Sequence, residues 1–265
     1  MLLPALGRAK LKAQGVQCMS NNHQLSMAWR LYAEDNREVL VYCSQNPNPS
    51  HYNQWAWATD NMTYTSGDTA NWDVDKDMAL RPLWQYNKSA AIYHCPADRS
   101  TVLDQNGVAR PRTRTMSMNA FLGGLAPDDK SPSPLGSLTV FTGAGSLTVY
   151  SKLTQLVAPA GPPDKIFLFI DEREDCINWG NYLVNMNGYS PNNPALYMFD
   201  QDMPAFYHGS AAGLSFVDGH AEVHKWKDPR TMPALHVGSV WQPTITVPRD
   251  ADVAWLQDHA SRLPQ

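Results

Sequence analysis

The chain has 265 residues and a formal net charge of −4, and its Lys and Arg residues form no block. This balance is not typical of proteins that bind nucleic acid or an anionic membrane surface. Hydrophobic residues make up 43% of the chain and can fill a core, whereas 20 Pro and 16 Gly favour short elements joined by long loops over a helical bundle or a doubly wound sheet.

The first part of the chain predicts one long helix. Apolar residues recur at three- to four-residue spacing over residues 6–35, and most of the basic residues lie opposite them. Residues 47–77 are rich in Asn, Asp, Thr and Trp and predict a long loop. A short helix is expected at residues 78–86, and a strand ended by proline at residues 92–98.

The rest of the chain predicts a sheet. Residues 165–170 are apolar on both faces and predict a central strand. The other expected elements are an extended run at 114–119, a Gly- and Pro-rich loop at 123–145, a helical turn at 153–158, a hairpin at 214–226 and a short amphipathic helix at 250–260. The predicted fold class is therefore α+β with an antiparallel sheet.

The hairpin carries the most informative motif of the chain, in which His208 is followed after nine residues by Asp218-Gly219. Asp-Gly suits a two-residue turn, because both positions then need positive φ. If Val217 pairs with His220, the core face holds Leu214, Phe216, Ala221 and Val223, and the opposite face holds Ser215, His220, Glu222 and His224.

Two interpretations of this motif stay open. In the first, His208, Asp218, His220 and His224 bind zinc in a metal-dependent hydrolase. In the second, which the exposed face predicted for His220 and His224 favours, the motif is structural. Gly219 then satisfies the turn, Asp218 accepts hydrogen bonds from nearby backbone N–H groups, and the ring of His208 ties its loop to the hairpin.

Several segments, in order along nearly the whole chain, resemble one family. They are Met-Leu-Leu-Pro-Ala-Leu-Gly-Arg-Ala-Lys at residues 1–10, residues 18–29 and 32–36, Tyr-His-Cys-Pro-Ala-Asp at 93–98, Ser-Met-Asn at 117–119, Phe-Ile-Asp-Glu-Arg-Glu-Asp-Cys-Ile-Asn at 169–178, and the motif above. Together they resemble pilin-like, type II secretion pseudopilin-type proteins, which carry a prepilin-type cleavage and methylation segment and a C-terminal His-X9-Asp-Gly motif.

The resemblance implies a pilin-like fold, in which residues 1–35 form the pilin-type helix and residues 36–265 a globular head. We expect the chain to begin within the last turns of the apolar segment that crosses the inner membrane in this family. The implied protein is a non-enzymatic subunit on the periplasmic or extracellular face, with other pilin-like subunits and secretion machinery as partners. An alternative is a carbohydrate-binding module on a pilin-type anchor, with Trp55, Trp57 and Trp72 contacting a glycan or a partner.

An acidic run after the predicted central strand is a candidate calcium site, because calcium takes six to eight oxygen ligands. Its residues are Asp171, Glu172, Glu174, Asp175 and Asn178. The resemblance supports this expectation, since major pseudopilins hold calcium in a loop. The alternative is a solvated loop in which Arg173 neutralises a neighbour.

The four cysteines are widely separated and form no CxxC pair, a pattern that fits an exported protein with one or two disulfides. The residues alone allow three connectivities, and buried free thiols are the alternative. Because Cys18 and Cys95 both lie in segments that match the family, the resemblance suggests that they pair, which leaves Cys43 with Cys176.

Overall fold

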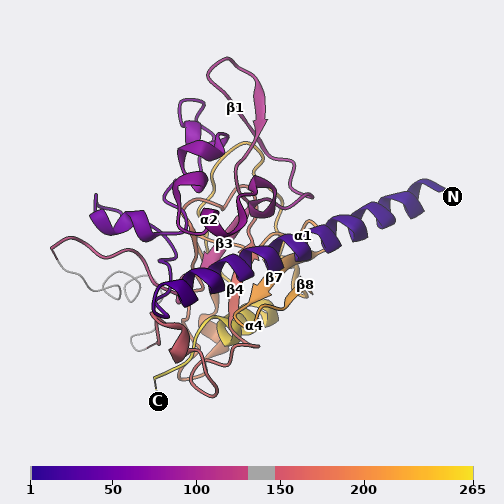
Figure 1. The fold of residues 1–265 in the computed structure, drawn as a ribbon. Coiled ribbons are helices and arrows are strands. Elements are labelled where there is room, and N and C mark those ends of the chain that lie inside the picture. Colours follow the sequence, from indigo (N-terminus) through magenta and orange to yellow (C-terminus); the bar gives the residue numbers. More distant parts are fainter. Residues whose placement is uncertain (1, 131–146, 265) are drawn as a thin grey trace.

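A single long helix dominates the computed structural model, which describes residues 2–130 and 147–264. Helix α1 (Leu2–Asp35) forms as predicted. Its second half lies across the head of the protein and its first half projects from it (Figure 1). Within the described residues, no helix combines the length and the apolar character that crossing a membrane requires. The predicted Gly- and Pro-rich loop at 123–145 falls largely outside the described residues.

The central sheet has five strands in the order β5-β3-β4-β7-β8. These are β5 (Asn181–Tyr182), β3 (Met116–Asn119), β4 (Phe167–Asp171), β7 (Ala211–Phe216) and β8 (Ala221–Lys225). β4 is the middle strand, as predicted. Its neighbours β3 and β7 run antiparallel to it, and β8 runs antiparallel to β7, whereas the short edge strand β5 pairs with β3 in parallel. The fold is therefore α+β with a mixed rather than a purely antiparallel sheet.

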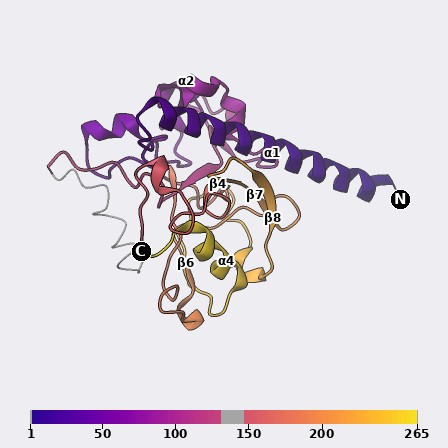
Figure 2. The same cartoon turned by 60° about the horizontal axis from the view of Figure 1, so that its bottom comes forward.

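The sheet lies between two helices, α1 on one face and α4 (Ala251–Ala260) on the other (Figure 2). Leu168 and Phe169 belong to the core that includes residues of α1, whereas Phe167 and Ile170 belong to the core that includes residues of α4. A register shift between Phe167 and Phe169 explains why the two faces do not alternate strictly. Because both faces of β4 are covered, its sequence is apolar throughout.

Most of the remaining chain is loop with short elements. The head contains α2 (Trp84–Asn87) and two small two-stranded sheets, β1 (Thr101–Leu103) with β2 (Ala109–Pro111) and β6 (Met198–Asp200) with β9 (Thr244–Thr246). Its 3-10 turns are His51–Trp55, Thr69–Asn71, Val74–Lys76, Met78–Leu80, Ala90–Tyr93, Leu153–Gln155, Pro194–Leu196 and Pro229–Thr231.

The strand predicted at residues 92–98 does not form. Its first residues belong to the 3-10 turn Ala90–Tyr93, which packs on α1 instead of a sheet edge. The side-chain amide of Asn21 donates 3.0 Å hydrogen bonds to the carbonyls of Ala91 and His94. A buried helix side chain thus takes the place of a neighbouring strand as partner for this backbone.

The β7–β8 hairpin forms, but one residue out of the predicted register. Ser215 pairs with Ala221 and Leu214 with Glu222. The loop has three residues, closed by a hydrogen bond from the Gly219 N–H to the Phe216 carbonyl, and only Gly219 in it has positive φ (+96°). This is a type I turn followed by a glycine bulge, so the two-residue turn was the wrong prediction.

The shifted register moves the polar row of β8 onto the face that carries Leu214 and Phe216. There the ring of His224 stacks on Trp255 of α4 at 3.8 Å between ring centres, and the ring of His220 stacks on Phe216 at 4.2 Å. The two histidines therefore pack against aromatic rings on the α4 side of the sheet.

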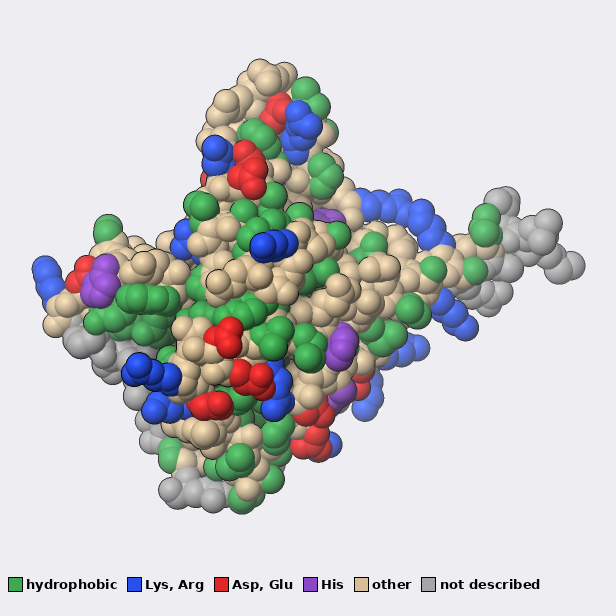
Figure 3. Space-filling model, in the orientation of Figure 1, with side chains coloured by type: hydrophobic (Ala, Val, Ile, Leu, Met, Phe, Trp, Pro, Cys, Tyr) green, Lys and Arg blue, Asp and Glu red, His purple; other side chains and the backbone are tan. Residues whose placement is uncertain are grey.

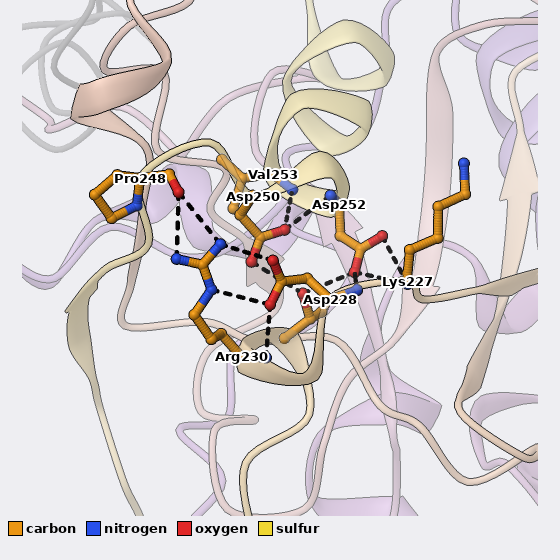
Figure 4. Close-up of polar contacts among 8 residues, drawn as sticks. Lys227, Asp228, Arg230, Pro248, Asp250, Asp252 and Val253 are labelled. Carbon is orange, nitrogen blue, oxygen red and sulfur yellow. Dashed lines mark hydrogen bonds and ion pairs between the residues drawn. The ribbon is translucent and has the colours of Figure 1, made fainter.

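A buried polar network fixes the N-terminus of α4 to the end of β8 (Figure 4). Asp250 caps the helix by accepting hydrogen bonds from the backbone N–H groups of Asp252 and Val253. The carboxylate of Asp252 accepts hydrogen bonds of 2.8–3.0 Å from the backbone N–H groups of Lys227 and Asp228. This network holds α4 against the face of the sheet opposite α1.

Candidate metal centre

Four residues that are distant in sequence meet where α1 crosses the sheet. Cys18 comes from the middle of α1, Cys95 from the loop after Ala90–Tyr93, Asp171 from the end of β4, and His208 from the turn before β7. One potential ligand atom from each lies within 4.8 Å of the other three. No other group of three or more His, Cys, Asp or Glu side chains converges in this way in residues 2–130 and 147–264.

The contacts within this four-residue cluster are close and are shielded from solvent. The Sγ of Cys95 lies 3.2 Å from His208 Nε2, and Asp171 Oδ2 lies 3.9 Å from both His208 Nε2 and Cys18 Sγ. The side chain of His208 is 2% exposed, and both thiols and the carboxyl group are fully buried.

Burial shifts the protonation equilibria of the cluster toward uncharged forms. Desolvation raises the pKa of Asp171 well above its ordinary value, and the adjacent Cys95 adds to this. Desolvation likewise raises the pKa of Cys95 and lowers that of His208. The pKa of Cys18 is also raised, because burial and the charge of Asp171 outweigh the lowering effect of its contact with Cys95.

Two polar atoms of the cluster have no hydrogen-bond partner among the described residues, namely Asp171 Oδ1 and His208 Nδ1. Unpartnered buried polar atoms are uncommon in folded proteins and need an explanation. Asp175, four residues beyond Asp171, is equally buried but receives two hydrogen bonds from Arg173, at 2.5 and 2.7 Å. No Lys or Arg forms an ion pair with Asp171 in the described part of the chain.

The strand β7 closes the cluster from one side. A Cβ atom placed on Gly213 would lie 2.5 Å from Cys18 Sγ and 3.2 Å from Asn22 Nδ2. The same amide group of Asn22 lies 3.7 Å from Cys18 Sγ. Glycine at this position therefore lets the helix and the strand approach closely enough for Cys18 to reach Asp171.

The two ends of the His-X9-Asp-Gly motif are far apart. His208 precedes β7 and Asp218 follows it, and a strand of six residues spans roughly 20 Å. The predicted ring hydrogen bond from His208 to the hairpin does not form among the described residues, where the ring contacts Cys95 instead. Asp218 does accept a hydrogen bond from the backbone N–H of His220, at 3.0 Å, as its turn role predicts. The proposed zinc set of His208, Asp218, His220 and His224 does not converge.

The acidic run after β4 is buried, so the prediction of a solvated loop was wrong. Arg173 does neutralise Asp175, as one alternative held, and Glu172 accepts a 2.6 Å hydrogen bond from the Ser117 hydroxyl. The Asn178 side chain accepts from the backbone N–H of Trp179. The carboxylates of Asp171, Glu172, Glu174 and Asp175 do not form a group of three whose ligand atoms all lie within 4.8 Å of one another. Calcium binding at this run stays a prediction.

All four cysteines are buried free thiols, so neither expected disulfide is present. Cys43 belongs to the core on the α1 side and Cys176 to the core on the α4 side, which separates that pair. Cys18 and Cys95 do come together, but in a group that also contains a carboxyl and an imidazole.

The three tryptophans predicted to form a partner or glycan surface have different positions. Trp57 is fully buried and donates a 2.8 Å hydrogen bond to the Gly180 carbonyl, so its assignment to a surface was wrong. Trp72 is half-buried, and its indole nitrogen is shielded from solvent. Only Trp55, at 41% exposure, presents a large apolar area.

Comparisons with known proteins add no assignment, since no family model, no curated protein and no solved structure matches the chain. Sequence reasoning had selected each residue of the four-residue cluster, but for three different roles. The cysteines were predicted to form a disulfide and Asp171 to bind calcium. His208 was predicted to tie down a loop or, in the alternative, to bind zinc with Asp218, His220 and His224. Their sequence separations of 77, 76 and 37 residues (from positions 18, 95, 171 and 208) contain no metal-binding spacing that would have joined them.

Proposed function

We propose that this chain is a non-enzymatic, pilin-like subunit whose projecting helix packs against the same helix of neighbouring copies. The observation that carries the proposal is the unequal burial of α1. From Cys18 to Ala33 the helix buries a continuous stripe against the head, whereas the described side chains from Leu6 to Ala13 are all exposed. A helix that packs against the head at one end and is exposed at the other is suited to packing against neighbouring subunits.

The exposed part of α1 has the chemistry of a helix that meets another helix. Leu6 is 69% exposed, Leu11 40% and Val16 62%, and these apolar residues alternate with the exposed Lys10 and Lys12. Basic side chains are visible on the projecting helix in Figure 3. Residues 2–14 extend over about 20 Å at 1.5 Å per residue, enough for three turns of helix contact.

In this proposal the head faces outward and the bundled helices form the core of a short filament. An apolar segment ahead of α1 would anchor the subunit in the inner membrane and place the head in the periplasm or on the outer face. Secretion machinery would be the further partner. The hydrolase alternative lacks support, because His220 and His224 stack on aromatic rings and are separated from His208.

Site-specific photocrosslinking in cells that make this protein tests the proposal. A benzophenone amino acid is placed at Leu6 or Val16 on α1, and at Val237 as a control of similar exposure (77%) on the head. We expect covalent dimers from both α1 positions and none from position 237. Dimers that are absent at both α1 positions, or equally strong at position 237, would contradict the assembly role.

A variant that introduces a charge separates assembly from folding. Val16→Glu places a charge at an exposed apolar position of α1 and should abolish the crosslink at Leu6, while its free energy of unfolding stays within about 0.5 kcal/mol of the parent's because the residue is 62% exposed. Val237→Glu should keep the crosslink. Reading the DNA ahead of Met1 supplies an independent check, since an in-frame basic leader and apolar segment are expected there.

A further inference from the structure

We propose that Cys18, Cys95, Asp171 and His208 bind one zinc ion, which joins helix α1 to the sheet and to the loop that follows Ala90–Tyr93. The assignment is independent of filament assembly. It rests on the convergence of four ligand-type side chains in the interior, from four separate segments of the chain.

The spacing of the ligand atoms fits a tetrahedral ion. Zinc bonds of about 2.3 Å to sulfur and about 2.0–2.1 Å to nitrogen or oxygen place neighbouring ligand atoms roughly 3.2–3.8 Å apart. The Cys95–His208 distance is 3.2 Å, and the distances from Asp171 to His208 and to Cys18 are both 3.9 Å. Movements of roughly half an ångström or less bring these three pairs to that spacing.

An ion also resolves the buried acid at the centre of the cluster. Asp171 is fully buried without an ion pair to Lys or Arg among the described residues, in contrast to Asp175 beside Arg173. A disulfide between Cys18 and Cys95 would leave this carboxyl group and the His208 imidazole unexplained. A divalent cation uses all four side chains.

The proton and charge balance is straightforward. Binding displaces one proton from each thiol and one from the carboxyl group where it is protonated, while the neutral imidazole binds through Nε2. Three anionic ligands and a 2+ ion leave a net charge of −1. The amide of Asn22, 3.7 Å from Cys18 Sγ, provides an N–H group that faces this charge.

The ligand types select zinc over calcium, because calcium takes six or more hard oxygen ligands and thiolates favour softer ions. Four protein ligands in a fully buried site leave no open position for a substrate, which indicates a structural ion. A cavity of about 300 Å³ borders the site on the side of His208, which lines it together with Gly15 of α1 and Val223 of β8.

Zinc content and cobalt spectroscopy on the full chain test this inference. Protein purified without chelator is expected to carry one zinc per chain, with Cys18 and Cys95 both reduced. Exchange of zinc for Co²⁺ should produce a thiolate-to-cobalt charge-transfer band together with the intense visible bands of tetrahedral cobalt. These two readouts need no variant, so they stand even if the substitutions below prevent folding.

Two serine variants provide a matched pair. Cys95→Ser removes a proposed ligand and should weaken zinc binding more than about 100-fold. Cys43→Ser alters an equally buried free thiol outside the four-residue cluster and should keep one zinc per chain. A Cys18–Cys95 disulfide in protein isolated without reductant, a cobalt spectrum without thiolate bands, or equal loss of zinc from both variants would each overturn the inference.

Discussion

Replacing Gly213 by alanine tests how tightly β7 and α1 approach each other. The added Cβ would lie 2.5 Å from Cys18 Sγ, about 1 Å short of the 3.5–4.0 Å optimum for non-bonded atoms. Neither atom sits at the end of a long side chain, so the strand or the helix must move. Overpacking of this kind lowers the free energy of unfolding by about 1–3 kcal/mol, and we expect a value in the upper half of that range. Alanine also loses less backbone entropy on folding than glycine, which offsets less than about 1 kcal/mol of this loss.

A double-mutant cycle isolates the clash. Cys18→Ala alone removes one buried sulfur and should cost about 1 kcal/mol, but in the Gly213→Ala background it also removes the colliding atom. We therefore expect the loss in free energy of unfolding in the double variant to be about 2 kcal/mol smaller than the sum of the losses in the two single variants. The assay is urea unfolding with chelator and reductant present, so that metal binding does not contribute.

A control with the opposite sign lies on the helix side of the same cluster. A Cβ on Gly15 would meet Val223 at an ordinary 3.6 Å, so Gly15→Ala should stabilise the protein by up to about 1 kcal/mol through helix propensity. If the double variant is additive within about 0.5 kcal/mol, or if both alanines have the same effect, the close approach of β7 and α1 is not what constrains position 213.

Three further substitutions probe the buried polar groups. Asp252→Ala leaves two backbone N–H groups without their acceptor and removes the closer of the two acceptors of the Thr231 hydroxyl, so it should lower the free energy of unfolding by about 2–4 kcal/mol. Asp258→Ala, at a side chain 57% exposed, should change it by no more than about 0.5 kcal/mol. Arg173→Met leaves the buried Asp175 carboxylate without its cation and should lower the free energy of unfolding, measured in urea, by about 3–5 kcal/mol. Burial raises the pKa of Asp60 to about 6, so the stability that its protonated form contributes is complete below its unfolded pKa near 3.8 and is lost as the pH rises through 6. Asp60→Asn should remove at most about 3 kcal/mol of this pH dependence, and parallel pH profiles for variant and parent would refute that assignment.

The elements that follow from a strong local pattern were predictable. The apolar spacing of α1 and the uninterrupted apolar run of β4 each reflect one helix face or one buried strand, so the sequence carries the signal locally. The strand predicted at residues 92–98 failed because its partner is a helix side chain, Asn21, more than 70 residues away. Such a partner leaves no periodicity in the segment that it binds.

The hairpin register was missed for a similar reason. Asp218-Gly219 allows either a two-residue turn or a three-residue turn with the glycine as a bulge, and these differ by one residue in pairing. The structure adopts the second, and the rings of Trp255 and Phe216 then receive His224 and His220. The Asp-Gly dipeptide alone leaves the register ambiguous, and the adopted register is accompanied by aromatic contacts with Trp255 of α4 and Phe216 of β7.

The His-X9-Asp-Gly spacing is best understood as the length of one strand with its two ends. His208 lies before β7 and joins the four-residue cluster, whereas Gly219 lies after β7 and supplies the positive φ of the turn. Between them, Gly213 has no Cβ atom, so the side chain of Cys18 can lie directly against β7. An insertion within β7 would move either the histidine away from Cys95 or the glycine out of the bulge. In this chain the nine-residue spacing therefore serves the joint between helix and sheet, and it requires no contact between the two ends of the motif.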